Sequence, residues 1–143
     1  MVRCAVGYRS RAFVTLGPPI ALAGFDPESR RDLVSLAHRV QDEIGRLYKV
    51  LPTALVASVL RPQATRAEIV ARLDERLAVL AAGGANLAVR SGRQAAEEGL
   101  ARLDERGVIV QERSRVRVRD RLVLRYYART IQHLIQPARR ATH

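Results

Sequence analysis

The segment TALVASVL at residues 53–60 is apolar on almost every side, and it lies between two prolines. A helix of this kind is stable in water only when neighbouring elements enclose it. Pro52 breaks any helix that comes before it, and Pro62 marks the end of the segment. The sequence therefore predicts a short buried helix over 53–60, which other elements must cover.

The preceding segment predicts a longer amphipathic helix from about 27 to 49. Asp26 is the expected N-cap, and Pro27 is the expected first helical residue. Apolar residues recur there at helical spacing: Leu33, Leu36, Ala37, Val40, Ile44 and Leu47. This spacing gives the helix a single apolar stripe.

Two more helices follow the buried one. The first begins with the T-x-x-E pattern of a capping box, Thr65 and Glu68, and two glycines at 83–84 stop it. Its apolar stripe consists of Ile69, Leu73, Leu77 and Leu80. The second runs from about 93 to 106 and ends at Gly107, after a connection with room for a short extended piece.

The remaining elements are β-type runs. RAFVTL at 11–16 predicts a short strand, and VIVQ and RVRVR, separated by ERS, predict a hairpin at about 108–119. The predicted fold class is α+β, mainly α. It is a helical domain with a winged-helix-like C-terminal half, made of helices plus a small β-hairpin, and a short N-terminal strand.

The C-terminal segment LVLRYYARTIQHLIQ at 122–136 predicts a closing helix with two different sides. One side is an apolar stripe of Leu124, Tyr127, Ile131, Leu134 and Ile135. The other side is basic and polar, with Arg121, Arg125, Arg129, Gln132 and Gln136. His133 lies on the border, where we expect it to make a structural hydrogen bond. So continuous a stripe favours packing against the buried helix 53–60, with the arginines outside.

Charge restricts the partners that the chain can have. The net charge is +11, and Lys49 is the only lysine among 25 basic residues, so all the others are arginine. Nucleic acid, anionic lipid headgroups, acyl carrier protein and phosphorylated substrates all fit this charge. Cys4 is the only cysteine, which excludes an internal disulfide. The longest run of low charge, 12–25, is too short and too often interrupted by glycine and proline to span a bilayer.

The predicted hairpin and the helix before it test the nucleic-acid hypothesis. Because side chains alternate between the two faces of a strand, Arg115, Arg117 and Arg119 lie on one face of the predicted hairpin. There they either bind phosphates or are solvated. The helix that would enter a groove carries four carboxylates: Glu97, Glu98, Asp104 and Glu105. Because carboxylates repel phosphates, this helix argues against nucleic acid as a partner.

Catalytic patterns are scarce. HRVQDE at 38–43 is close to a histidine–carboxylate motif, but Asp42 follows His38 after three residues rather than four. On a helix, His38 and Asp42 form an i,i+4 surface pair. There is no Ser/His/Asp set, glycine-rich phosphate loop or metal-ligand cluster. We therefore expect no catalytic, cofactor-binding or metal-ligating residue, and no cofactor.

Three segments, taken in order, resemble the C-terminal region of bacterial glycerol-3-phosphate 1-O-acyltransferase: 11–22, 36–60 and 122–135. Pro18 stands where that family usually has Glu in an aromatic-Gly-Glu-Pro pattern. The terminal signature, Tyr-Tyr-Arg-Asn-x-Ile-x-His, is matched by Tyr126, Tyr127, Ile131 and His133. Ala128 and Arg129 depart from it.

The resemblance implies acyl transfer from acyl-CoA or acyl carrier protein to the sn-1 hydroxyl of glycerol 3-phosphate, a step in phospholipid synthesis. It implies that residues 1–25 are the end of the acyltransferase domain and that 26–143 form a C-terminal helical domain. The family's His-x4-Asp block is absent, so we expect a fragment or separate domain that is inactive alone. The expected partner is the missing catalytic domain, in the same or a separate chain.

The resemblance also implies a place at the membrane, cytoplasmic and peripheral at its inner face. Residues that could contact anionic headgroups or the partner are Arg121, Arg125, Arg129, Arg139 and Arg140. The alternative is a stand-alone basic winged-helix-like nucleic-acid-binding protein.

Overall fold

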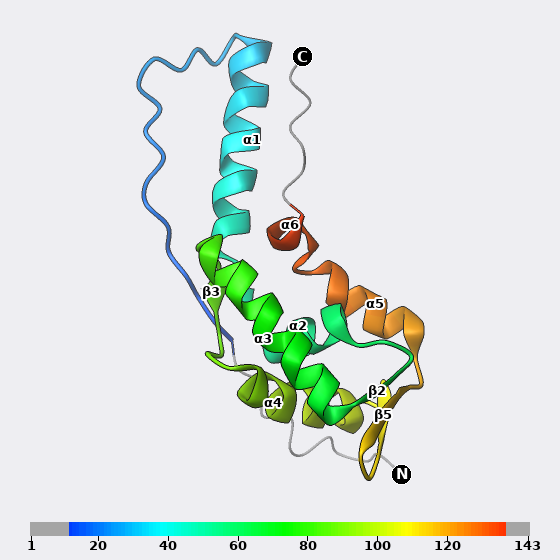
Figure 1. The fold of residues 1–143 in the computed structure, drawn as a ribbon. Coiled ribbons are helices and arrows are strands. Elements are labelled where there is room, and N and C mark those ends of the chain that lie inside the picture. The colour runs from blue at the N-terminus through cyan, green and yellow to red at the C-terminus, as the bar shows by residue number, and fades with distance from the viewer. Residues whose placement is uncertain (1–11, 137–143) are drawn as a thin grey trace, which may run out of the picture.

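A computed structural model describes residues 12–136 of the chain (Figure 1). The helices and strands in chain order are α1 Arg30–Leu47, β1 Lys49–Val50, α2 Pro52–Val59, β2 Gln63–Thr65, α3 Arg66–Ala82, β3 Asn86–Leu87, α4 Gly92–Glu105, β4 Ile109–Glu112, β5 Arg115–Val118, α5 Arg121–Arg129 and α6 Gln132–Ile135. The fold class is confirmed: the described chain is mainly helical, with a small antiparallel sheet.

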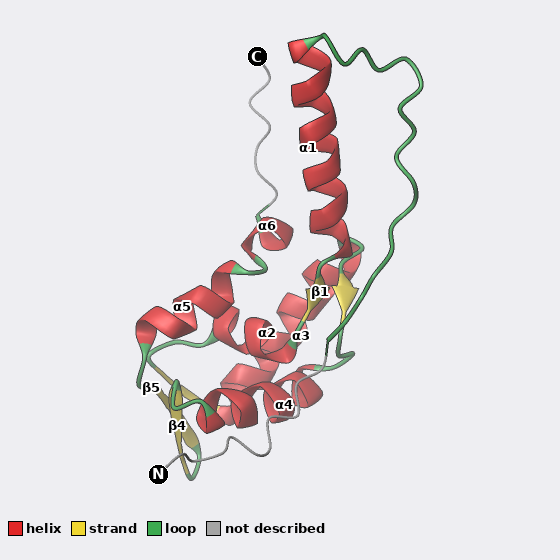
Figure 2. Ribbon diagram, turned by 180° about the vertical axis from the view of Figure 1, so that it is seen from behind, coloured by secondary structure: helices red, strands yellow, loops and turns green. Residues whose placement is uncertain are grey.

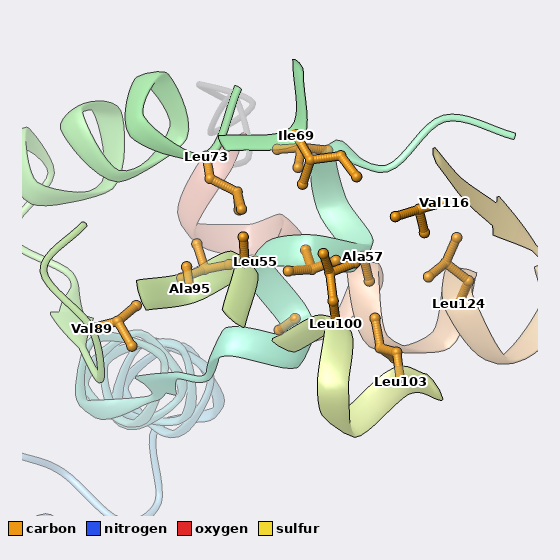
Figure 3. Packing of buried hydrophobic residues seen from close by; sticks show 14 of the residues in the cluster. Leu55, Ala57, Ile69, Leu73, Val89, Ala95, Leu100, Leu103, Val116 and Leu124 are labelled. Atoms are coloured by element: carbon orange, nitrogen blue, oxygen red, sulfur yellow. The ribbon is translucent and has the colours of Figure 1, made fainter. Parts of the chain in front are cut away.

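The predicted buried helix is α2, and it lies at the centre of the domain. It contacts α3, α4 and α5 on different sides, which encloses its apolar surface (Figure 3). Five of its eight residues are buried: Ala54, Leu55, Val56, Ala57 and Val59. Because an isolated helix of two turns is marginal in water, this burial is what keeps α2 helical. Pro52 occupies its first turn, where a missing N–H costs nothing.

Helix α4 approaches α2 closely because residue 99 has no side chain. A Cβ built at Gly99 would lie 2.6 Å from the carbonyl oxygen of Pro52 and 2.6 Å from Cγ2 of Val56. These two atoms leave no room for a methyl group at residue 99. Gly99 therefore fixes the distance between α2 and α4, while Leu100 and Leu103 on the same helix fill the core beside it.

The start of α3 confirms the predicted capping box. The Thr65 hydroxyl accepts from the Glu68 N–H, and the Glu68 carboxylate accepts from the Thr65 N–H at 2.8 Å. These hydrogen bonds from Thr65, the backbone one first, lower the pKa of Glu68. The four residues of the predicted stripe, Ile69, Leu73, Leu77 and Leu80, are all buried.

The hairpin is present, and the structure adds a third strand that the sequence did not predict. β4 and β5 pair antiparallel, and β2 joins the other side of β5, so the strand order is β2-β5-β4. Ala64 of β2 pairs with Val116 of β5, and both are buried. The order α2, β2, α3, α4, β4, β5 with this sheet is that of a winged helix, which confirms the winged-helix-like half.

Helix α1 extends away from the rest of the domain, and residues 12–29 run along it as a stretch without regular secondary structure (Figures 1 and 2). None of the α1 residues is buried. After the C-terminal end of α1, the chain enters β1, which pairs in parallel with β3. Helix α6 contacts α1. The stretch 12–22 contacts this end of α1: a Cβ at Gly17 would lie 2.7 Å from Leu47, and Lys49 lies over the Phe13 ring.

Two predictions near the N-terminus are wrong. The predicted strand at 11–16 is not formed over its described part, 12–16, because no described strand pairs with it. The N-cap of α1 is Ser29, whose hydroxyl accepts from the Asp32 N–H, and not Asp26. Asp26 instead accepts from the Glu28 N–H in the turn before the helix.

The predicted closing helix is broken into α5 and α6. The Thr130 hydroxyl donates to the carbonyl of Tyr127 at 2.7 Å, and Ile131 leaves the helical conformation. A threonine hydroxyl that binds nearby backbone competes with helix continuation. The apolar stripe is nonetheless confirmed, since Leu124 and Ile131 are buried and α5 packs on α2.

The contact at Gly99 can be tested by adding one methyl group. We expect Gly99→Ala to lower the free energy of unfolding by about 1–3 kcal/mol, because overpacking against a backbone carbonyl outweighs alanine's higher helix propensity. Urea denaturation provides the measurement. Gly83→Ala is the matched control, since its Cβ would have no atom closer than 3.5 Å. Equal effects of the two substitutions would contradict the close-contact argument.

Candidate functional site

The outer side of α5 carries the predicted basic residues. Arg121, Arg125 and Arg129 are all exposed and recur at four-residue intervals, so they form one row along the helix. The only carboxylate near the start of the helix, Asp120, is occupied as its N-cap and accepts from two backbone N–H groups. Arg139 and Arg140 lie outside the described residues.

Two exposed apolar side chains, which were not predicted from the sequence, lie beside these arginines. Leu122 is 81% exposed and Tyr126 is 67% exposed. They follow Arg121 and Arg125 by one position and share the same spacing, which is the signal that could have revealed them. The outer side of α5 is therefore both basic and apolar, with no acidic side chain within the helix.

Helix α1 presents an apolar groove. A shallow hollow of about 470 Å³ runs along it, lined by Leu33, Leu36, Ala37, Val40, Gln41 and Ile44. Leu33 is 48% exposed and Ile44 is 64% exposed. The groove lies on the predicted apolar stripe of this helix, which is therefore confirmed as a stripe but is not covered by any described element.

The histidine and the carboxylate of the HRVQDE segment lie on the surface of α1. His38 and Asp42 are both exposed on α1. In residues 12–136, no group of three histidine, cysteine or acidic side chains is placed to hold a metal ion. Within the same residues, no helix combines the length and the apolar character needed to cross a bilayer.

The winged-helix surface is only partly basic. On the hairpin, Arg115 is exposed and Arg117 lies 3.5 Å from Glu112, which offsets its charge. On α4, the helix that would read a groove, Glu97 and Glu98 are exposed, and Arg102 pairs with Glu105 at 2.9 Å. Exposed carboxylates on the reading helix oppose contact with phosphates.

Tyr127 and His133 connect the C-terminal segment to other elements. The Arg106 guanidinium donates to the Tyr127 hydroxyl, and it also lies 5.6 Å from the ring centroid, which ties α5 to the end of α4. Nε2 of His133 lies 3.3 Å from the carbonyl oxygen of Gly45, and its ring meets Tyr48 edge to face. The expected hydrogen bond at His133 is thus present, and it joins α6 to α1.

The comparison with protein families identifies the family of the chain. The model of the glycerol-3-phosphate acyltransferase C-terminal region matches residues 11–139. The chain belongs to the glycerol-3-phosphate acyltransferase family. No curated protein and no solved structure matches it significantly.

The acyltransferase signature residues divide into packing and surface positions. Ile131 is fully buried, and Tyr127 is half-buried against Arg106. His133 contacts the end of α1, while Tyr126 stays exposed and meets only the edge of the Tyr127 ring among the described contacts. Three of the four residues therefore hold α5 and α6 in place, and Tyr126 alone belongs to the outer surface.

The two adjacent tyrosines provide a matched test of this division. We expect Tyr127→Phe to lower the free energy of unfolding by about 1 kcal/mol, since it removes the hydrogen bond from Arg106. Tyr126→Phe should change it by less than about 0.5 kcal/mol, because that side chain is exposed. Both are measured by urea denaturation. If Tyr126→Phe proved the more destabilising, the assignment of the two residues would be wrong.

Proposed function

We propose that this chain is the C-terminal, non-catalytic part of a glycerol-3-phosphate 1-O-acyltransferase. The complete enzyme transfers an acyl group from acyl-CoA or acyl carrier protein to the sn-1 hydroxyl of glycerol 3-phosphate. Such transfer needs a base held close to the substrate hydroxyl by an orienting group. His38 and Asp42 are exposed on a projecting helix and lack the family's spacing. The proposed role is therefore to support a catalytic domain that supplies these groups, in the same or a separate chain.

The uncovered apolar side of α1 is the observation that carries the proposal. The groove on this helix includes the exposed Leu33 and Ile44, and Val14 and Leu16 in the stretch before the helix are exposed as well. Surfaces of this kind on soluble proteins mark contacts with another domain or a membrane. In a chain that matches the C-terminal region of the family, we assign this surface to the catalytic domain, with residues 1–25 as the end of that domain.

We further propose that the chain works on the cytoplasmic side of the membrane, peripheral at its inner face. The support is the outer side of α5, where the row of arginines lies beside Leu122 and Tyr126. Arginine stems and aromatic rings suit the boundary between headgroups and acyl chains, and anionic lipid attracts the charge. The exposed acidic residues of α4 disfavour the alternative role in nucleic-acid binding.

The inactivity of the isolated chain and the role of α1 can be tested together. The purified 143-residue chain should transfer no labelled acyl group to glycerol 3-phosphate. Added to a catalytic domain of the same family, it should form a complex, and Leu33→Glu with Ile44→Glu should weaken that complex at least about tenfold, because both carboxylates would be buried at the contact. Leu122→Glu is the control, since Leu122 is also an exposed apolar residue but lies on α5. Transfer by the isolated chain, or equal loss with the control, would contradict the proposal.

Binding to vesicles and to DNA separates the membrane role from the alternative. The chain should bind vesicles of anionic phospholipid, and Arg125→Gln with Arg129→Gln should weaken this binding about tenfold, at about 1 kcal/mol per charge near the surface. Arg30→Gln with Arg31→Gln removes the same charge from α1 as a control. Both ligands are titrated over a salt series. Tight, sequence-selective binding to duplex DNA with a steep salt dependence would favour the nucleic-acid alternative instead.

A further inference from the structure

A second hollow lies where the end of α2 meets the middle of α3, apart from the surfaces of α1 and α5. Its volume is about 560 Å³, which falls in the range of small-molecule sites. It is lined by Ser58, Val59, Leu60, Arg61, Arg72, Glu75, Arg76 and Val79. Three arginines against one carboxylate give this hollow a net positive charge.

One nitrogen of Arg72, a residue that lines the hollow, lacks a hydrogen-bond partner among the described residues. Nη1 of Arg72 is buried, and it has no hydrogen-bond acceptor within residues 12–136. A buried charged donor left unsatisfied is costly, and native proteins rarely keep one without a reason. Among the described residues, no ion pair involves Arg61, Arg72 or Arg76.

Two carboxylates, Glu68 and Glu75, lie near Arg72, but neither forms an ion pair with it. The pKa of Glu68 is lowered mainly by the backbone hydrogen bond from Thr65. The positive charges of Arg72 and Arg61 lower this pKa further. Its carboxylate is nevertheless occupied by the Thr65 N–H and hydroxyl, at 2.8 and 2.9 Å. Glu75 lines the hollow but is exposed, and it forms no ion pair with another described residue. Neither carboxylate thus accepts from the buried guanidinium nitrogen, which leaves that nitrogen available to an acceptor on a ligand.

The arrangement of the three arginines suits a phosphate group. Arg72 and Arg76 are one turn apart on α3, so they lie on the same face of the helix. Arg61 comes from the connection between α2 and β2 and lines the same hollow. Guanidinium groups bind phosphate oxygens in pairs, with a fixed geometry that lysine does not provide. The apolar part of the lining, with Val79 57% exposed, leaves room for a carbon chain next to the phosphate.

We propose that this hollow is a binding site for a phosphate monoester, with Arg61, Arg72 and Arg76 holding the phosphate and Val59, Leu60 and Val79 contacting its carbon portion. The ligand is either a soluble phosphate ester or a lipid with a phosphomonoester headgroup, since both present the same chemistry to the three arginines. The proposal concerns residues of this chain alone, so it does not rest on acyl transfer or on a catalytic domain.

The test is a calorimetric and NMR titration of the 143-residue chain at constant ionic strength. The soluble probes are glycerol 3-phosphate and inorganic phosphate. Vesicles containing phosphatidate, a monoester, are compared with vesicles containing equal charge as phosphatidylglycerol, a diester. We expect saturable binding of a soluble probe, or a preference for phosphatidate vesicles, with the α3 amide signals shifting in either case. The first result identifies a soluble ligand, and the second identifies a lipid headgroup.

Substitutions connect the binding to the hollow. Arg72→Gln and, separately, Arg76→Gln should each weaken binding of the effective probe about tenfold, through the loss of a charge-assisted hydrogen bond. Arg30→Gln removes the same charge from the start of α1 and should leave the affinity within twofold. The amide spectra of the free variants verify that each one is folded. The proposal is overturned if no probe binds saturably or selectively, or if Arg30→Gln weakens binding as much as the pocket variants do.

Discussion

The enclosure of α2 is the constraint on which the rest of this domain depends. An eight-residue helix has little stability of its own, whereas burying a single Leu or Val side chain contributes roughly 1.5–3 kcal/mol. Five buried residues on α2 therefore require neighbours on every side. Helices α3, α4 and α5 supply them, and the missing side chain at Gly99 lets α4 come within contact of the α2 backbone. Helix α5 covers α2 with its inner side only, so its outer side remains exposed, and no described element covers the apolar side of α1.

The winged-helix arrangement of this domain is explained by the packing of its own elements, without reference to DNA binding. Its sheet joins the hairpin to β2 through the buried pair Ala64 and Val116. The helix that would read a groove instead buries Ala95, Ala96 and Leu100 against α2 and α3 and leaves its carboxylates outside. A fold shared with nucleic-acid binders therefore says little about function, which has to be argued from the residues on each surface.

Much of the fold could be predicted because its signals are local. The capping box at Thr65 and the apolar stripe of α3 depend on residues a few positions apart, and both are present. The third strand was missed because only Ala64 of β2 is buried, and its partner β5 lies far along the chain. The break at Thr130 depends on how one hydroxyl binds the backbone. The row of arginines on α5 was predictable from spacing, whereas the hollow between α2 and α3 was not, since tertiary packing alone brings Arg61 to Arg72.

Composition alone explains some of these arginines but not all. A bias in the coding sequence would scatter arginine over exposed positions, where it pairs with whatever carboxylate is near, as Arg46 does with Glu43. Such pairs contribute little to stability and need no further reason. Arg72 is different, because a buried nitrogen without an acceptor costs about 1–3 kcal/mol and no bias in composition offsets that cost. Its position next to Arg76 and Arg61 fits the proposed phosphate site, in which a bound anion accepts a hydrogen bond from this nitrogen.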